Sequence, residues 1–161
     1  MGENVLMLKR KKEPWLNRWN GEGGKIEPGE SPTDALYREI LEETTINLKL
    51  AKKTIFAGIV TWEDTKQEKT KEIYGMYAFV SYLSDDQGFW KDERVTREGI
   101  LAWKPIEWVC NKNNDEVAGN LPYLLPAFIT SSEPKRYHCI FEEDIVKEVK
   151  IMPYLLPYSL V

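Results

Sequence analysis

The sequence predicts one mixed α/β (α+β) domain, spanning residues 1–161, with more strand than helix. Two segments have helical features, and the other apolar segments are short runs separated by turn signals. A chain of 161 residues suits a single domain with a substantial core, and no internal repeat, linker or low-complexity segment divides it. The apolar content of 42% and the charged content of 30% are those of an ordinary globular protein.

The N-terminal segment is expected to be extended at first and irregular afterwards. A short strand is predicted over residues 4–9, and residues 10–20 form a loop with one proline and two tryptophans. The stretch GEGGK, residues 21–25, is too rich in glycine for a helix, and Pro28-Gly29 marks a turn.

The first helix is expected over residues 32–44. Ser31 can cap its N-terminus, Pro32 suits the first helical position, and Asp34 lies favourably in the first turn. Its apolar positions recur at helical spacing and are expected to pack inward: Leu36, Ile40 and Leu41.

The rest of the chain is expected to be mostly strand, with a second helix over residues 121–130 that begins around Pro122. Strands are predicted near residues 48–62, 72–83, 99–104, 135–141 and 145–151. The polar segment 63–72 is expected to be an exposed hairpin loop, and Glu142–Asp144 the turn of the closing hairpin.

The net charge of −4 argues against a general nucleic-acid-binding protein, which usually carries a basic face. No stable nucleic-acid partner is therefore expected. The basic cluster Lys9-Arg10-Lys11-Lys12 is either a solvated strand end or a contact for phosphate.

Several features indicate a cytoplasmic protein without a membrane span. Cys110 and Cys139 lie far apart and set no disulfide or zinc-site spacing, which fits a reducing compartment. No apolar stretch approaches the roughly 18–20 residues needed to cross a bilayer, and the N-terminus has no apolar region of signal-peptide length. The single histidine, His138, is expected to be an ordinary residue of a late strand, which argues against a histidine-centred nucleophilic triad.

Three carboxylates gather near the C-terminal end of the predicted helix at 32–44. With an advance of about 100° per residue, Glu42 and Glu43 lie within about 60° of Glu39, on either side of it. Each like-charge pair costs about 0.2–0.5 kcal/mol on an exposed helix, and the helix dipole adds a similar amount per charge. The cluster is either a solvated acidic face or a cation site, and hard divalent cations such as Mg²⁺ take carboxylate oxygens.

The spacing around these carboxylates resembles the Nudix box of Nudix (MutT-like) hydrolases. The matching pattern over 23 residues consists of Gly24, Glu30, Arg38-Glu39-Ile40, Glu42-Glu43 and Thr45-Ile46. The resemblance implies the Nudix fold, with mixed β-sheets sandwiched between helices. It also implies hydrolysis of a nucleoside diphosphate linked to another group, using Mg²⁺, for which Mn²⁺ is a possible substitute.

Thr45 departs from the family pattern, which normally has glycine at this position. Glycine easily adopts the left-handed conformation that often ends a helix, whereas a β-branched residue does so poorly. We therefore expect a different cap at this end of the helix rather than the loss of the site.

The resemblance further implies roles for the box residues. Glu42 and Glu43 would hold the metal, and Glu39 would hold metal or act as the base toward the attacking water. Arg38 would orient these carboxylates by a charge-assisted contact, and Glu30 would brace the loop against the helix.

Two further metal ligands are implied outside the helix. One is the carbonyl oxygen of Gly24. The other is an acidic residue from a later loop: REGILAWKP, residues 97–105, resembles the family's Glu-Gly stretch, which nominates Glu98. The alternative is that Glu98 is an ordinary loop glutamate.

Resemblance outside the box points to enzymes that hydrolyse oxidised purine nucleoside triphosphates such as 8-oxo-dGTP. RWNGEGGK, residues 18–25, and KRYHCIFEEDIVKEV, residues 135–149, are similar to segments of that subgroup. The asparagine before Gly-x-Gly-Gly contacts the base there, which implies this role for Asn20; the alternative is a turn asparagine. Lys25, in the same segment, is expected to contact the substrate.

Three other residues are candidates for substrate binding by the same resemblance. GNLP, residues 119–122, resembles the Asn-x-Pro before the last helix of bacterial MutT, so Asn120 would read the base or cap the helix. Trp62 would stack on the base or pack in the core. Arg10 would contact phosphate or remain solvated.

The start of the chain and the substrate leave alternatives open. Family members usually have several more strand residues before ENVLMLKR, so the sequence is either truncated or has a short first strand, whose uncovered edge could favour association. The expected partner is a nucleotide substrate, and no membrane association is expected. The chain is expected to be a monomer or a homodimer. The rival functions are Nudix chemistry on ADP-ribose, a dinucleoside polyphosphate or a 5′-triphosphate RNA end, and a catalytically silent nucleotide-binding module.

Overall fold

The computed structural model describes residues 3–65, 74–84, 88–143 and 145–154. These residues form two four-stranded sheets and a few helices, which confirms the α+β class. The chain divides into two compact units, one of residues 1–54 and 81–122 and the other of residues 55–80 and 123–161. No helix in the described part of the chain is long and apolar enough to cross a membrane.

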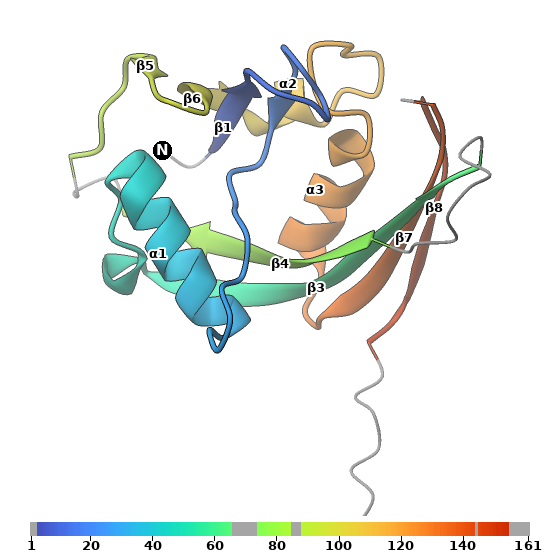
Figure 1. The fold of residues 1–161 in the computed structure, drawn as a ribbon, viewed down its shortest axis with the longest axis horizontal. Helices are drawn as coiled ribbons and strands as arrows, with labels where there is room; N and C mark the ends of the chain where they lie inside the picture. Colours follow the sequence, from blue (N-terminus) through green and yellow to red (C-terminus); the bar gives the residue numbers. More distant parts are fainter. Residues whose placement is uncertain (1–2, 66–73, 85–87, 144, 155–161) are drawn as a thin grey trace, which may run out of the picture. The chain divides into compact units, whose positions relative to one another are not determined.

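The first sheet lies in the first unit and has the strand order β2-β1-β6-β5. Figure 1 labels its strands β1, β6 and β5. Its strands are β1 Asn4–Arg10, β2 Trp19–Asn20, β5 Arg94–Val95 and β6 Gly99–Pro105. All neighbouring pairs are antiparallel, and β1 pairs with β6 along its full length. β1 is therefore an internal strand, although β2 covers only Leu8 and Lys9 of it. The two-residue strands β2 and β5 are too short to leave a pattern in the sequence.

Helix α1, Pro32–Thr44, has the predicted bounds and the predicted N-terminal cap. The Ser31 Oγ accepts a hydrogen bond from the Asp34 N–H at 3.1 Å. The prediction that Leu41 packs inward is wrong, because this residue is 49% exposed. At about 100° per residue, Leu41 lies about 140° around the helix from Leu36, outside the apolar stripe.

The C-terminal end of α1 keeps the cap that glycine would give. Thr45 itself adopts the left-handed conformation, with φ 64° and ψ 7°, and its N–H donates to the Leu41 carbonyl oxygen at 3.0 Å. The expectation of a different cap is therefore wrong. The buried Thr44 stabilises this end, because its Oγ1 donates to the Ile40 carbonyl oxygen at 2.5 Å and accepts the Ile46 N–H at 3.1 Å.

A Thr45→Gly variant is expected to raise the free energy of unfolding by about 0.5–1 kcal/mol. The left-handed conformation costs an L-residue roughly 1–2 kcal/mol, and the greater freedom of glycine in the unfolded chain offsets part of the gain. Urea denaturation measures the difference. Thr45→Ala is the matched control, because it removes the hydroxyl and keeps the Cβ. A glycine variant no more stable than the alanine variant would contradict the strain at this position.

The strand predicted near 48–62 begins later than expected. Leu48–Leu50 form a 3-10 helix, η1, capped by Asn47, whose Oδ1 accepts the Lys49 N–H at 3.0 Å. The local hydrogen bond of the asparagine side chain competes with an extended backbone here. The strand itself, β3, covers Lys53–Asp64. A short helix that the sequence did not suggest, α2, covers Ile106–Val109 directly after β6.

The second sheet has the strand order β4-β3-β7-β8 (Figure 1). Its other strands are β4 Tyr74–Tyr82, β7 Lys135–Glu142 and β8 Ile145–Pro153. β3 and β7 are parallel, whereas β7 and β8 are antiparallel, so this sheet is mixed. His138 is a residue of β7, as expected, and α3, Leu121–Thr130, confirms the second predicted helix.

Two predicted turns fall partly outside the described residues. Of the polar segment 63–72, Glu63 and Asp64 belong to β3, and residues 66–73 are not described. In the closing hairpin, Glu143 has a positive φ of 57°, and residue 144 is not described.

Tyr137 lies in the core of the second unit and is fully buried. Its ring makes an edge contact with Phe128, with centroids 5.0 Å apart, and its hydroxyl donates to the Ala57 carbonyl oxygen at 3.5 Å. The neighbouring Gly58 has a φ of 137° and starts the pairing of β3 with β7 opposite Lys135. A Cβ on Gly58 would collide with the Lys135 backbone, so these strands can approach only because the side chain is absent.

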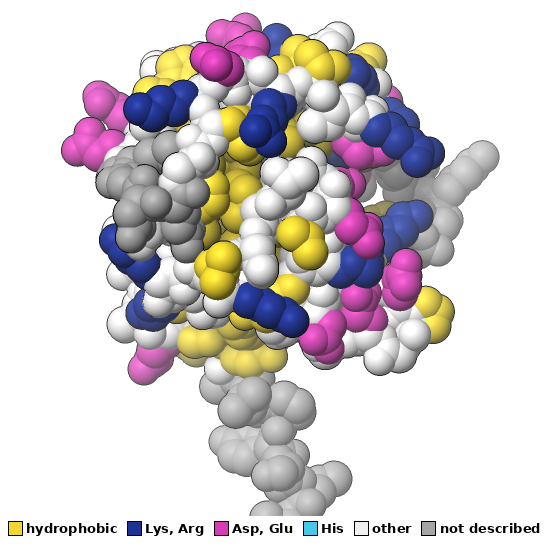
Figure 2. Space-filling model, turned by 90° about the vertical axis from the view of Figure 1, so that its left-hand side faces the viewer, with side chains coloured by type: hydrophobic (Ala, Val, Ile, Leu, Met, Phe, Trp, Pro, Cys, Tyr) yellow, Lys and Arg dark blue, Asp and Glu magenta, His cyan; other side chains and the backbone are white. Residues whose placement is uncertain are grey.

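The face drawn in Figure 2 carries charges of both signs. Lysine and arginine side chains lie among aspartates and glutamates, and the described residues in this view form no continuous basic patch.

Candidate active site

Arg38 connects α1 to the loop that precedes it. Its Nε and Nη2 donate to the two carboxylate oxygens of Glu30, each at 2.8 Å, and Nη2 also donates to the Lys25 carbonyl oxygen at 3.0 Å. Glu30 in turn accepts the Glu27 N–H at 3.0 Å. A bidentate arginine–carboxylate pair is strong and fixes geometry, so the loop from Lys25 to Glu30 is held against the helix.

The same contacts change the protonation of both partners. The Arg38 guanidinium, helped by the Glu27 N–H, lowers the pKa of Glu30 from 4.5 to about 2. The carboxylates of Glu30 and then Glu39 raise the pKa of Arg38 above its usual value. Glu30 therefore stays ionised at neutral and mildly acidic pH.

A pH dependence of stability follows from Glu30. Because its folded-state pKa is lowered, its stabilising contribution is fully present above pH 4.5 and is lost as the pH falls toward about 2. Glu30→Gln is therefore expected to be less stable than wild type at pH 7, with a gap that narrows between pH 4.5 and pH 2. Urea titrations across this range measure it. Glu27→Gln is the control, since its side chain is exposed and this variant should be as stable as wild type across the range. A stability difference for Glu30→Gln that does not depend on pH would contradict the role of the ionised Glu30 carboxylate.

Glu39 lies directly over Gly24. A Cβ added to Gly24 would collide with the whole carboxylate group of Glu39, so the glycine leaves the space that this group occupies. The Glu39 Oε1 is 2.9 Å from the Arg38 Nη1, and the Glu39 side chain is only 16% exposed. The loop backbone and Arg38 together place this carboxylate.

The other two carboxylates of α1 have different surroundings. Glu42 is 62% exposed and lies 3.7 Å from the Arg38 Nη1. Glu43 is half-buried and faces Glu22, a residue of the glycine-rich loop. The predicted face of three carboxylates therefore has one exposed member, Glu42, and two that face the loop.

Glu22 is a site residue that the sequence reading missed. Both of its carboxylate oxygens have less than 1 Å² of accessible surface, and neither has a hydrogen-bond partner among the described residues. Burial is the main cause that raises the pKa of Glu22 to about 9, and contact with the Glu43 carboxyl is the second. The negative charges of Glu43 and, more weakly, Glu39 raise this pKa further, whereas the positive charge of Arg10 lowers it. The only signal in the sequence is a glutamate between glycines, which by itself suggests a solvated loop residue.

The donor set fits a divalent cation that needs few protein ligands. Among the described residues no three histidine, cysteine, aspartate or glutamate side chains are grouped as a ready-made metal cage. Mg²⁺ usually takes one or two carboxylates and completes its shell with waters and substrate phosphates. The buried, unpartnered Glu22 carboxylate beside Glu43 is a pair that such a cation would stabilise.

Glu98 and Arg10 are engaged elsewhere. Glu98 is 36% exposed, and its Oε1 pairs with the Lys12 Nζ at 3.3 Å. The Arg10 Nε donates to the Pro14 carbonyl oxygen at 2.8 Å and so supports the loop between β1 and β2. In this arrangement Glu98 pairs with Lys12 and does not join the carboxylates Glu39, Glu42 and Glu43 of α1.

The two candidate asparagines differ in their hydrogen bonding. The Asn20 Oδ1 accepts the Gly21 N–H at 2.9 Å, the local contact expected of a turn asparagine. The Asn120 Oδ1 is buried and has no partner among the described residues, so it does not cap α3. An unoccupied buried acceptor is the more suggestive of the two for recognition of a ligand.

The last two predicted substrate residues lie in different units. Lys25 is exposed in the loop before α1, where its carbonyl oxygen binds Arg38. Trp62 belongs to β3 in the second unit and stacks on Tyr74, with ring centroids 6.3 Å apart.

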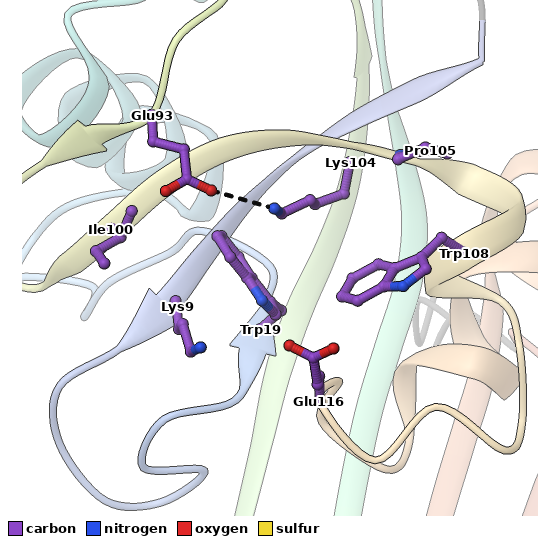
Figure 3. A pocket seen from close by; sticks show the side chains of 8 residues that line it. All are labelled: Lys9, Trp19, Glu93, Ile100, Lys104, Pro105, Trp108 and Glu116. Carbon is purple, nitrogen blue, oxygen red and sulfur yellow. Dashed lines mark hydrogen bonds and ion pairs between the residues drawn. The ribbon is translucent and has the colours of Figure 1, made fainter.

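A cavity of about 460 Å³ also lies in the first unit, and none of the residues predicted for the site lines it. Its lining consists of Lys9, Trp19, Glu93, Ile100, Lys104, Pro105, Trp108 and Glu116 (Figure 3). The Lys104 Nζ lies 4.2 Å from the centroid of the Trp19 ring and 3.3 Å from Glu93. Because successive side chains of a strand point to opposite faces, Lys9 and Arg10 lie on opposite sides of β1. Arg10 therefore points away from the cavity that Lys9 lines.

A glycine-rich loop held by an Arg–Glu pair against a helix with clustered carboxylates defines the Nudix class of domains. The chain belongs to this family: the model of the NUDIX domain matches residues 1–128. Nudix hydrolases act on diphosphate linkages.

Individual relatives agree with this class. A Bacillus subtilis (strain 168) protein named "Putative 8-oxo-dGTP diphosphatase" is 45% identical over 51 residues, which are 32% of each chain. The match thus spans about a third of that relative's length. The crystal structure of the mutator MutT protein from Bacillus halodurans has a TM-score of 0.69 at 22% identity and covers 95% of this chain and 92% of that one. The NUDIX domain of Shewanella oneidensis NrtR, solved with ADP ribose, has a TM-score of 0.55 at 16% identity, covering 77% and 74%. Both structures share the fold.

Proposed function

We propose that this chain hydrolyses a nucleoside triphosphate to the monophosphate and pyrophosphate in a reaction that depends on Mg²⁺ or Mn²⁺. The preferred substrate is an oxidised purine nucleotide such as 8-oxo-dGTP. The observation that carries the proposal is the placement of Glu39 over Gly24 by Arg38, beside the Glu22–Glu43 pair.

The residues of α1 have separate roles in this reaction. Glu42 and Glu43 would hold the cation, with the Gly24 carbonyl as a further ligand. Glu98 would join them only after leaving its pair with Lys12. A divalent cation bound there supplies neutralisation of phosphate oxygens and activation of water.

Glu39 is either a further ligand or the base that takes the proton of the attacking water. Arg38, 2.9 Å from Glu39, orients this carboxylate, and Glu30 fixes Arg38 from the other side. Most of the catalytic contribution of the chain is therefore positioning and electrostatics.

The preference for an oxidised purine is supported by the resemblance of residues 18–25 and by the name of the Bacillus subtilis relative. An amide can donate and accept hydrogen bonds on adjacent purine atoms, which suits Asn20 and Asn120. Trp62 would stack on the base, and Lys25 and Arg10 would contact phosphate. The free thiols of Cys110 and Cys139 fit the proposed cytoplasmic location, with the chain as a monomer or a homodimer.

A nucleotide panel with pyrophosphate detection tests the proposal. dGTP, 8-oxo-dGTP, ATP, ADP-ribose, a dinucleoside polyphosphate and a 5′-triphosphate RNA are compared with Mg²⁺, and again with chelator. The proposal expects turnover of 8-oxo-dGTP well above that of dGTP and none with chelator. Equal turnover of the two guanine nucleotides would reject the oxidised-purine preference, and inactivity on all substrates would favour a silent nucleotide-binding module.

Asn20→Ala is expected to reduce the ratio of kcat/KM between 8-oxo-dGTP and dGTP by about tenfold, since one lost hydrogen bond to a base edge is worth about 1–2 kcal/mol. The measurement is kcat/KM for each nucleotide with both proteins. An unchanged ratio would leave Asn20 as the turn residue that its contact with Gly21 indicates.

A further inference from the structure

The loop residue Glu22 presents a carboxylate whose two oxygens are buried and whose neighbour is the Glu43 carboxyl. Both oxygens have less than 1 Å² of accessible surface and no hydrogen-bond partner among the described residues. A buried carboxylate without a partner is costly, so such groups in proteins are paired, hydrogen-bonded or bound to a metal. Glu22 belongs to the loop before α1 and is not part of the acidic face of the helix itself.

Arg10 is the cationic side chain whose charge acts on Glu22, but it makes no hydrogen bond with the Glu22 carboxylate. The guanidinium of Arg10 donates to the carbonyl oxygens of Pro14 and Glu13 at 2.8 and 3.5 Å. Arg38 donates to Glu30 and Lys25 and pairs with Glu39 at 2.9 Å. The group that Glu22 faces instead is the Glu43 carboxyl. Two carboxyl groups face to face require either a shared proton or a cation between them.

We propose that Glu22 is a ligand of the divalent cation, supplied by the glycine-rich loop and completing a pair with Glu43 of α1. The proposal rests on the proposed function, in which Glu43 holds the cation. Two carboxylates with open positions for water and phosphate match the coordination that Mg²⁺ and Mn²⁺ usually adopt in nucleotide enzymes. Gly21 and Gly23 flank Glu22, and a Cβ at either would meet nothing within 4 Å, so the loop has room to adjust around a bound ion.

The proposal has a consequence for substrate recognition. Asn20 is two residues before Glu22, and Gly24, which underlies Glu39, is two residues after it. A cation bound to Glu22 would thus fix the loop that carries both Asn20, the candidate contact to the base, and Gly24, which leaves space for the Glu39 carboxylate.

Binding of Mn²⁺ to the full chain without nucleotide tests the proposal, with free Mn²⁺ quantified by electron paramagnetic resonance. Glu22→Gln is expected to weaken Mn²⁺ binding at least about tenfold, as loss of a metal contact does. Its thermal stability without metal should be unchanged or higher, because a buried carboxyl facing another is removed. Glu27→Gln, in the same loop and exposed, is the matched control and should bind as wild type does. Should Glu22→Gln fail to fold, Glu22→Leu carries the same expectation with an apolar side chain.

A third variant separates this proposal from the proposed function. Glu43→Gln should weaken Mn²⁺ binding if the α1 carboxylates hold the cation. Wild-type affinity in Glu22→Gln together with weak binding in Glu43→Gln would overturn the role of Glu22 alone and leave a proton shared with Glu43. Equal binding by wild type and both variants, or no binding by wild type, would overturn the cation site itself.

Discussion

A Glu42→Gln, Glu43→Gln variant is expected to lose at least about 10²-fold in kcat while remaining folded. Removing groups that stabilise charge in a phosphoryl-type transition state typically costs this much or more. The variant should unfold no more readily than wild type, because like charges at the C-terminal end of α1 repel each other and oppose the helix dipole. Urea denaturation compares the free energies of unfolding directly, and an increase of up to about 1 kcal/mol is expected from the removal of these repulsions.

The measurement is kcat as a function of Mg²⁺ concentration for wild type and variant. Glu107→Gln is the control, since Glu107 is an exposed helical glutamate of α2 whose loss should change neither quantity. Undiminished turnover in the double variant would remove Glu42 and Glu43 from the proposed metal site. Lost turnover with a lower unfolding free energy would instead point to a damaged helix.

Gly24→Ala is the second substitution expected to have a large effect. The new Cβ would occupy the space of the Glu39 carboxylate, which lies at the end of a flexible side chain and can swing away. Because displacement of a catalytic group by about 1 Å can cost about 10²-fold in rate, kcat should fall about 10²-fold. The melting temperature should change little, because the glycine has no positive φ and the side chain that moves is not part of the core.

Gly23→Ala is the matched control, since a Cβ there meets nothing within 4 Å. It should retain most of the wild-type kcat and a similar melting temperature. Comparable activity of the two alanine variants would show that the position of Glu39 over Gly24 is not required for the reaction. A large loss in both would assign the effect to the stiffness of the loop instead.

The sequence determined the parts of this protein that depend on nearby residues. The bounds and cap of α1 follow from Ser31, Pro32 and Asp34, whose effects act within one helical turn. The convergence of Glu39, Glu42 and Glu43 follows from helical spacing alone. The longer strands and α3 also followed from patterns of apolar residues and turns, because a run of several residues leaves a readable period.

Other features were decided only by the tertiary structure. The exposure of Leu41, the 3-10 turn at Leu48–Leu50 and the pairing of Glu98 with Lys12 depend on neighbours that the local pattern does not contain. Thr45 adopts a left-handed conformation that a β-branched residue intrinsically disfavours. The hydrogen bonds of Thr44 and of the helix end determine the backbone there.

Glu22 shows most clearly the difference between what the local sequence determines and what the tertiary structure decides. In the sequence it is a glutamate among glycines, a pattern typical of a solvated loop. In the fold, the loop that Arg38 holds against α1 buries this carboxylate beside Glu43. The sequence by itself thus determined the helix, its carboxylates and the family of this protein, since each depends on spacing along the chain. Only the tertiary structure decided which carboxylates lie in a dry environment, because burial depends on segments that meet in space.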